Sequence, residues 1–217
     1  GKTDSAVIIP LGVVCKKNKI IKDRYRSNKI ITIGRLADFK KYNEILIVLL
    51  DKINSKLDKT KQLELHIYGD GTLLDKLKKI ASQQSSKIYF HGVIPYRSIG
   101  NIFKEAFVFV GMGTTLIEAS EQGTVSIIGA GDFDNQLTYG HFYSIDNFLS
   151  GEKCSQCSLE KYENLLINLR NLTEKKYLEI QHLNVKKSRR FDIEIITTRL
   201  IRYLHQSTLF NFNFNEF

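Results

Sequence analysis

Five short apolar runs within the first 130 residues each end on a glycine, and this repeated feature limits the folds open to the chain. They are ITIG ending at Gly34, HIYG at Gly69, YFHG at Gly92, VFVG at Gly111 and SIIG at Gly129. One glycine after a strand is ordinary turn chemistry. In open α/β sheets, however, ligands lie outside the carboxyl ends of the strands, where a missing side chain lets backbone amides approach them. The repeated glycines therefore predict one extended crevice lined by backbone.

Strand-like and helix-like patterns alternate along the chain. We expect strands at 6–9, 29–33, 63–68, 88–91, 107–110 and 124–128, and helices at 42–57, 73–81, 96–104 and 115–122. After Gly151 the pattern is helical, over 159–172, 175–183 and 191–205. This order predicts an α/β fold: a Rossmann-like, doubly wound parallel sheet in three α/β/α layers, with a helical C-terminal region. We expect one domain over 1–205 and a flexible tail over 206–217, which ends in FNFNFNEF.

Length and composition narrow the class of protein. With 217 residues, 42% of them hydrophobic, the chain can bury a sizeable core, and disorder throughout is excluded. No apolar run approaches the roughly 20 residues of a membrane helix, and the N-terminus lacks a signal-peptide pattern. We therefore expect a cytoplasmic protein. The chain starts at Gly1 without a methionine, which suggests a piece of a longer protein.

The three cysteines are too few for a disulfide framework, and an odd number is typical of a reducing compartment. Cys154 and Cys157 have the spacing of a zinc or redox motif. No second pair of ligands follows them, and His141 is the only other ligand nearby. We therefore expect two unpaired surface thiols here, with a structural zinc as the lesser alternative.

The net charge of +9 is concentrated in residues 15–29, a run that contains seven Lys or Arg residues and a single acid, Asp23. Such a run is most often a solvated loop, but it is also typical of sites for anionic lipid or phosphate. Nucleic acid is not an expected partner, because Tyr25 alone interleaves the charges and no nucleic-acid-binding module is recognisable.

Two common nucleotide-binding signatures are absent. The G-x-G pairs at Gly69–Gly71 and Gly129–Gly131 lack the third glycine of a dinucleotide fingerprint, since Leu74 and Asp134 stand in its place. No P-loop sequence occurs either. Asp132-Phe-Asp134 has the letters of an acidic metal motif, but its glycine-flanked setting favours a turn.

Three local features nevertheless indicate an anionic ligand. Arg35 and Lys40 lie in the loop that leaves one strand, where two cations could grip a diphosphate. GMGTT at 111–115 leads into a helix whose free N–H groups and dipole favour a phosphate. Glu118 follows one turn later, within reach of hydroxyls beyond that phosphate. On spacing alone, a capping box from Thr115 to Glu118 explains this acid slightly better.

The ordered series IIPLGV, IGRLADFKK, LHIYGDGTLLDKL, IYFHGVIP and GMGTTLIEASEQGTVSII resembles the C-terminal, donor-binding half of a family 4 (group 1) glycosyltransferase with the GT-B architecture. The resemblance covers about residues 7–129. It implies transfer of a sugar from a nucleotide-diphosphate sugar, with retention of configuration and with neither a metal nor a cofactor. It also implies that the acceptor site lies on an N-terminal GT-B domain outside this chain, so the fragment alone should be nearly inactive.

The resemblance assigns roles to particular residues. Arg35 and Lys40 match the basic pair that contacts the diphosphate and stabilises it as it leaves, and Glu118 matches the acid that binds the ribose hydroxyls. The remaining donor-binding positions that it implies are Gly34, Gly69, Gly71, Gly92, Val93, Ile94, Gly113, Thr114 and Thr115. The last three form the phosphate-binding turn, and residues 92–95 line the base.

One position departs from the family pattern: Val110 stands where the first acid of the pair is expected, close to the donor sugar. The resemblance therefore does not indicate which residue recognises the sugar, or whether the mode of catalysis is that of the family. The alternatives are a nucleotide-binding interaction module without transfer, a nucleotide-sugar epimerase, or a binder of phosphate or lipid surfaces that uses the basic run. Relatives of this kind often build bacterial surface polysaccharides such as capsule, O-antigen or exopolysaccharide. That role would add a lipid-linked acceptor and a peripheral position on the inner face of the membrane.

Overall fold

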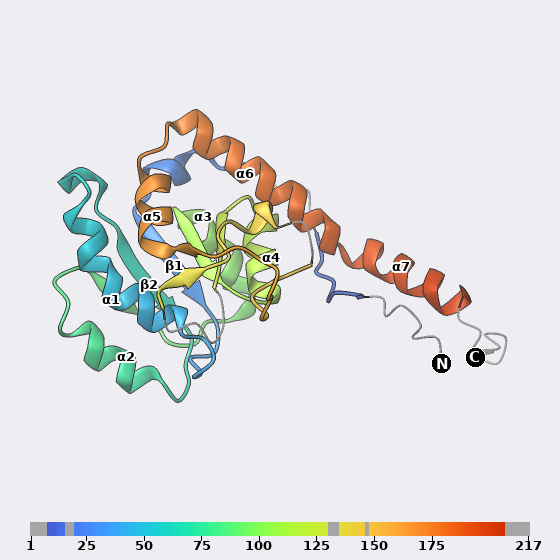
Figure 1. The fold of residues 1–217 in the computed structure, drawn as a ribbon, viewed down its shortest axis with the longest axis horizontal. Coiled ribbons are helices and arrows are strands. Elements are labelled where there is room, and N and C mark those ends of the chain that lie inside the picture. The colour runs from blue at the N-terminus through green and yellow to red at the C-terminus, as the bar shows by residue number, and fades with distance from the viewer. Residues whose placement is uncertain (1–7, 16–19, 130–134, 146–147, 207–217) are drawn as a thin grey trace.

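The computed structural model describes residues 8–15, 20–129, 135–145 and 148–206, and its centre is one parallel sheet (Figure 1). The five strands are β1 (Lys29–Ile33), β2 (Glu64–Tyr68), β3 (Ile88–Phe90), β4 (Val108–Gly111) and β5 (Val125–Ile128). Their order is β3-β2-β1-β4-β5, and every neighbouring pair is parallel. The sheet is therefore doubly wound about β1, and all five carboxyl ends lie at one edge.

Helices cover both faces of the sheet, as the alternation along the chain predicts. On one face, α1 (Tyr42–Ser55) and α2 (Leu74–Ala81) pack with strand residues such as Ile30 and Leu65. On the other face, α3 (Ile99–Glu105) and α4 (Thr114–Glu121) pack with Ile31 and Phe109. Neighbouring residues of a strand point to opposite faces, so β1 contributes to both cores.

The C-terminal region differs from its predicted form in detail. It contains α5 (Tyr162–Arg170), α6 (Glu174–Ser188) and α7 (Ile193–Gln206), and α7 extends away from the body of the molecule (Figure 1). A short antiparallel pair, β6 (Leu137–Thr138) with β7 (Glu160–Lys161), precedes α5. The helix expected from residue 159 therefore begins three residues later, because residues 160 and 161 are extended to pair with β6.

Two other boundaries were predicted wrongly. Ile8 and Ile9 are not in a strand, and the rest of the run at 6–9 lies outside the described residues. The helix expected from Tyr96 starts as a 3₁₀ turn, η3 (Tyr96–Ser98), before α3. The remaining 3₁₀ turns are η1 (Lys22–Arg26), η2 (Lys59–Lys61), η4 (Phe142–Ser144) and η5 (Arg189–Phe191).

The basic run at 15–29 is not simply a solvated loop, because one of its charges is structural. Arg24, in η1, is 1% exposed. Its Nε donates to the Phe103 carbonyl at 3.1 Å, and Nη1 donates to the Gln122 carbonyl at 2.8 Å. These acceptors lie at the C-terminal ends of α3 and α4, where a cation is favoured. Burial lowers the pKa of Arg24 to about 10, so the side chain stays charged at neutral pH.

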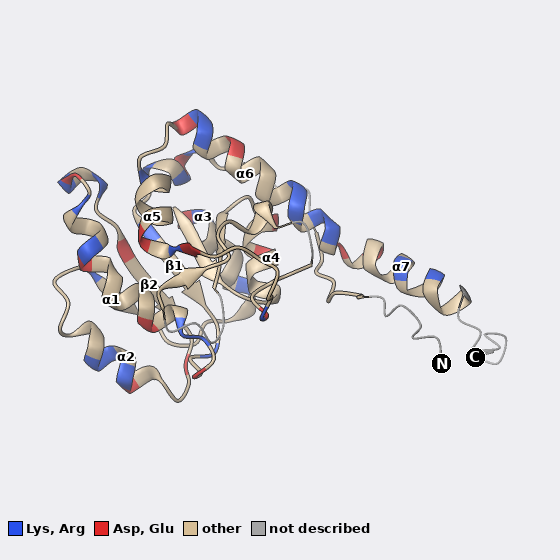
Figure 2. Cartoon of the chain, viewed as in Figure 1, with Lys and Arg blue, Asp and Glu red and all other residues tan. Residues whose placement is uncertain are grey.

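Basic residues are not confined to this run. Lys and Arg also occur on α2, at the end of α6 and on α7 (Figure 2).

The expectation of two unpaired thiols was wrong. Cys154 and Cys157 form a disulfide, and their Cα atoms are 5.6 Å apart. A turn at Ser155 and Gln156 brings residues three apart within the range that a disulfide can bridge. Cys15 is free and half-buried. Among the described residues, no group of three or more His, Cys, Asp or Glu side chains is placed to hold a metal ion. Asp132 and Asp134 lie outside that part of the chain.

None of the helices that the structure describes is long and apolar enough to cross a bilayer.

Candidate functional site

The strand ends are joined through their backbones at the edge of the sheet where the sequence predicts a crevice. Gly34 N donates to the Tyr68 carbonyl at 3.0 Å, and Gly69 N donates to the Gly92 carbonyl at 2.7 Å. A Cβ on Gly69 would lie 1.9 Å from the Gly34 carbonyl oxygen. Likewise, a Cβ on Gly71 would lie 2.3 Å from the Leu36 carbonyl oxygen. Both glycines are therefore required for packing between neighbouring loops.

The five strand-end glycines do not share one role. Cβ atoms on Gly111 and Gly129 would strike the rings of Phe109 and Tyr42, so these two glycines serve the core. A Cβ on Gly92 would meet nothing within 4 Å. Gly92 alone of the five thus has open space beside it, and the idea that all five let a ligand approach was too broad.

Lys40 and Arg35 lie at the carboxyl end of β1, as the sequence predicts. A Cβ on Gly34 would lie 2.6 Å from Lys40 Nζ, so the ammonium group lies directly over the end of the strand. Burial, and secondarily the positive charge of Arg35, lowers the pKa of Lys40. Arg35 itself is exposed. No acid pairs with either cation among the residues that the structure describes, which leaves both available to an anion.

The N-terminus of α4 lies at the same edge, after the neighbouring strand β4. Gly113 is its N-cap, with φ 69° and ψ −150°, a conformation essentially restricted to glycine. Gly113 N donates to the Ser150 carbonyl at 2.7 Å. For the backbone N–H groups of Thr114 and Thr115, the described part of the chain offers no acceptor. Two free amides and the helix dipole therefore favour an anion here.

Glu118 does not form the capping box that its spacing slightly favoured. A capping box needs Thr115 at the N-cap position, whereas the helix begins one residue earlier, after Gly113, and has no side-chain cap. Glu118 Oε1 instead accepts a hydrogen bond from the Tyr96 hydroxyl at 2.8 Å. This bond raises the pKa of Tyr96. Glu118 Oε2 has no partner among the described residues.

Tyr96 is a neighbour of the site that the sequence did not reveal. It directly follows the segment Gly92–Pro95, which was expected to line a nucleotide base, and it is 74% exposed. Val93 in that segment is 75% exposed, whereas Ile94 packs partly into the core beside α3 and α4. The segment thus presents backbone and two apolar side chains, Val93 and Pro95, outward. The signal in the sequence was the tyrosine that directly follows Pro95.

Val110 does not face the edge of the sheet where Arg35, Lys40 and the start of α4 lie. It is fully buried and pairs in register with Ile127 of β5, and its side chain belongs to the core on the α1 face. An acid at this position of the strand would be buried among apolar residues. The side chain at position 110 is therefore not accessible to a ligand.

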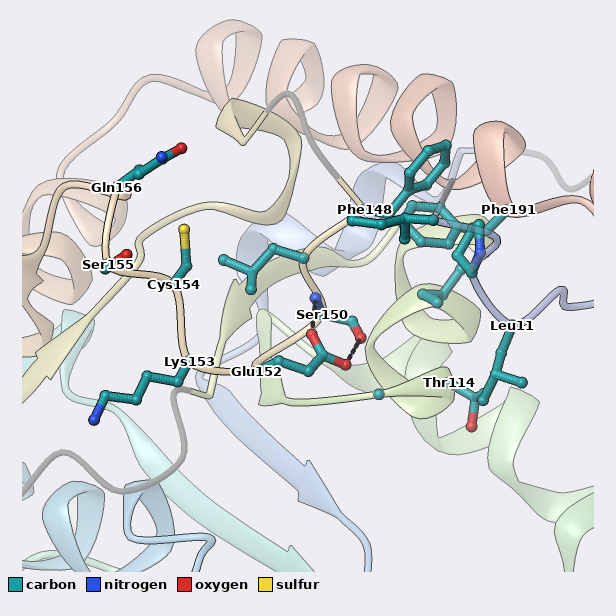
Figure 3. A pocket seen from close by; sticks show the side chains of 15 residues that line it. Leu11, Thr114, Phe148, Ser150, Glu152, Lys153, Cys154, Ser155, Gln156 and Phe191 are labelled. Carbon is teal, nitrogen blue, oxygen red and sulfur yellow. Dashed lines mark hydrogen bonds between the residues drawn. The ribbon is translucent and has the colours of Figure 1, made fainter. Parts of the chain in front are cut away.

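A cavity of about 530 Å³ opens beside the start of α4 (Figure 3). Gly113 and Thr114 line it, together with Glu152 and other residues of the loop at 148–156. Arg35, Lys40 and Glu118 do not line it. No sequence motif indicated that this loop borders a ligand site, because its residues reach α4 only through the tertiary fold.

Comparison with known proteins places the chain in a family. The family model described as "Glycosyl transferases group 1" matches residues 16–137, which is more than half of the chain. The chain belongs to the group 1 glycosyl transferases. A search of curated protein sequences found no match.

Three solved structures resemble this glycosyl transferase domain. TarM from S. aureus, in a complex that includes UDP and α-GlcNAc-glycerol, has a TM-score of 0.64 at 15% identity; the match covers 93% of this chain and 40% of TarM. The pneumococcal O-GlcNAc transferase GtfA, with UDP and GlcNAc, has a TM-score of 0.54 at 18% identity, over 91% and 38%. The lipopolysaccharide outer core galactosyltransferase WaaB has a TM-score of 0.56 at 14% identity, over 92% and 55%.

These likenesses confirm the predicted fold class, the Rossmann-like α/β half of the GT-B architecture. The domain spans about two fifths of TarM and of GtfA and just over half of WaaB.

Proposed function

We propose that this domain binds the nucleotide-diphosphate-sugar donor of a glycosyltransferase. In the complete enzyme, an N-terminal GT-B domain would supply the acceptor site. The observation that carries the proposal is the meeting of three features at one edge of the sheet: the cations after β1, the free amides of α4 after β4, and the carboxylate of Glu118 one turn further on. Because β1 and β4 are neighbours, these groups can act on one ligand.

The charges fit a diphosphate as the leaving group. As the bond between sugar and phosphate breaks, negative charge grows on the diphosphate. Preplaced Lys40, Arg35 and the amides of Thr114 and Thr115 stabilise that charge more than they stabilise the ground state. Glu118 Oε2 would accept hydrogen bonds from the ribose, and the exposed backbone around Gly92 would border the base. Arg35 and Lys40 are thus the proposed catalytic residues.

The family resemblance extends the proposal to the reaction. The transfer would be of a hexosyl type, with retention of anomeric configuration and without a metal or another cofactor. A role in bacterial surface polysaccharide synthesis would bring a lipid-linked acceptor at the membrane surface. Support for the nucleotide comes from TarM and GtfA, whose structures contain UDP.

Titration with UDP, GDP and ADP tests the donor site. We expect one of them to bind, and Glu118→Ala to weaken that binding about tenfold or more, because the variant loses charge-assisted hydrogen bonds to the ribose. Isothermal titration calorimetry measures the dissociation constant of the nucleotide for the wild type and for the variant. Glu105→Ala, which removes an exposed acid from α3, is the matched control and should bind like the wild type. If no nucleotide binds, the donor-site proposal fails; if Glu118→Ala binds unchanged, Glu118 is not the ribose ligand.

Measuring sugar transfer by the isolated chain tests whether this domain supplies only the donor site and the N-terminal domain supplies the acceptor site. We expect nucleotide binding but almost no transfer, because the acceptor site would lie on the N-terminal domain. The measurement is release of nucleoside diphosphate from its sugar conjugate in the presence of candidate acceptors, with the full-length enzyme as the positive control. Transfer by the chain alone at a rate typical of a complete enzyme would contradict the proposal.

A nucleotide-binding module without transfer is the second candidate, and the burial of Val110 favours it, since no acid reaches the crevice from that position. A full-length protein that binds the nucleotide sugar but never transfers the sugar would decide for this alternative. Conversion of one nucleotide sugar into another would indicate the epimerase alternative.

A further inference from the structure

We propose that the cavity beside α4 holds the sugar of the donor, and that Glu152 binds the sugar hydroxyls in place of the acid that is missing at position 110. This inference rests on the proposed function, because it assumes a diphosphate at the N-terminus of α4. It adds a residue, a subsite and a class of sugar to that proposal.

The position of the cavity supports this assignment. Gly113 and Thr114 form one side of it, and the free amide of Thr114 belongs to the phosphate site. Glu118 lies on another flank of α4, where it meets Tyr96. A nucleoside that is held at Glu118 and a diphosphate that is held at the helix start would direct the attached group toward the cavity. Its volume of about 530 Å³ is within the usual range for small-molecule sites.

The lining of the cavity suits a pyranose ring. One wall is apolar, with Ile117, Leu149 and Phe191 among its residues. Ser150 and Glu152 add polar groups to the lining (Figure 3). A pyranose likewise has apolar C–H faces and a polar rim of hydroxyl groups. The cavity can therefore pack against a face of the ring and hydrogen-bond its rim.

Glu152 is held in place from the helix start. Gly113 N donates to the Ser150 carbonyl at 2.7 Å. Ser150 in turn donates from its backbone N to Glu152 Oε2 at 2.7 Å and from Oγ to Oε1 at 2.8 Å. Each carboxylate oxygen has two lone pairs, so one on each oxygen remains for a ligand hydroxyl. The carboxylate is thus positioned before any ligand binds.

The charge of the cavity indicates which sugars fit. Glu152 and Lys153 are the charged residues in its lining. The neighbouring Lys153 side chain points away from Glu152 in Figure 3, so it does not neutralise this carboxylate. A uronic or sialic acid would bring a second carboxylate against the first. The subsite therefore favours a neutral sugar with free hydroxyl groups.

The test compares a nucleoside diphosphate with its sugar conjugates on this chain. The probes are UDP, GDP and ADP and their glucose conjugates, and for uridine also the galactose, N-acetylglucosamine and glucuronic acid conjugates. We expect a neutral conjugate to bind the wild type more tightly than the diphosphate does, and glucuronic acid to give no such gain. Glu152→Gln should weaken the neutral conjugate about tenfold and change the affinity of the diphosphate less than twofold. Glu174→Gln, an exposed acid on α6, is the control.

A second variant is needed because Glu152→Gln can also disturb the loop through the bonds between Glu152 and Ser150. Leu11 lines the cavity and is 76% exposed, so Leu11→Trp can fill the space with little effect on folding. It should likewise weaken only the sugar conjugate. If both variants bind diphosphate and conjugate as the wild type does, or weaken both equally, the sugar subsite is refuted while the donor site stands. If none of the three diphosphates binds the wild type, the proposed function itself fails.

Discussion

Gly69→Ala is expected to cost about 3–5 kcal/mol of folding free energy, because it combines overpacking with backbone strain. The added Cβ would lie 1.9 Å from the Gly34 carbonyl oxygen, and Gly69 has a φ of 131°. The obstacle is backbone, so no side-chain rotation relieves it, and the loops after β1 and β2 must separate. Nucleotide binding should fall as well, because Lys40 lies over Gly34. Urea unfolding followed by circular dichroism measures the change in stability.

Gly92→Ala is the matched control. Gly92 also follows a strand and has a positive φ of 68°, but a Cβ there would meet nothing within 4 Å. The variant should therefore lose only about 1 kcal/mol, the cost of a left-handed conformation. Equal losses in the two variants would show that contact between the loops is not what requires Gly69.

Arg24→Met should destabilise the chain by about 2–4 kcal/mol, the range for hydrogen bonds from a buried charge. Arg24 donates to the carbonyls of Phe103 and Gln122, and so ties the ends of α3 and α4 together. Methionine fills much of the same volume but cannot donate. The Gln122 carbonyl would lose its bond to Arg24, and the favourable charge at two helix C-termini would disappear. The midpoint of urea unfolding should fall with little change in slope.

Arg26→Met tests whether burial, and not charge, is the cause. Arg26 lies in the same 3₁₀ turn but is exposed. Replacing it should change stability by less than about 0.5 kcal/mol. If both variants unfold at the same urea concentration, the two bonds of Arg24 do not stabilise the fold.

Much of the fold could be predicted because local pattern and core burial agree. In the helix expected at 42–57, Ile45, Leu49, Ile53 and Leu57 recur at helical spacing, and all four are buried. The five strands of the parallel sheet appear where apolar runs end in glycine. Predictions failed where a distant partner decides the conformation. Glu160 and Lys161 are extended because they pair with Leu137 and Thr138, and neither segment carries that information by itself.

The candidate site likewise contains residues that the sequence predicts and residues that only the tertiary structure reveals. Sequence alone determined the groups that follow a strand directly, namely Arg35, Lys40 and the turn before Glu118, because parallel strands bring their carboxyl ends to one edge. Only the tertiary structure decided what surrounds them: the hydroxyl of Tyr96 on Glu118, the burial of Val110, and Glu152 held beside Gly113 by Ser150. The bond from Tyr96 to Glu118 and the bond from Gly113 to Ser150 both join residues that are far apart in the sequence. Local periodicity reports which face of an element is buried, but it carries no record of which distant side chain lies opposite.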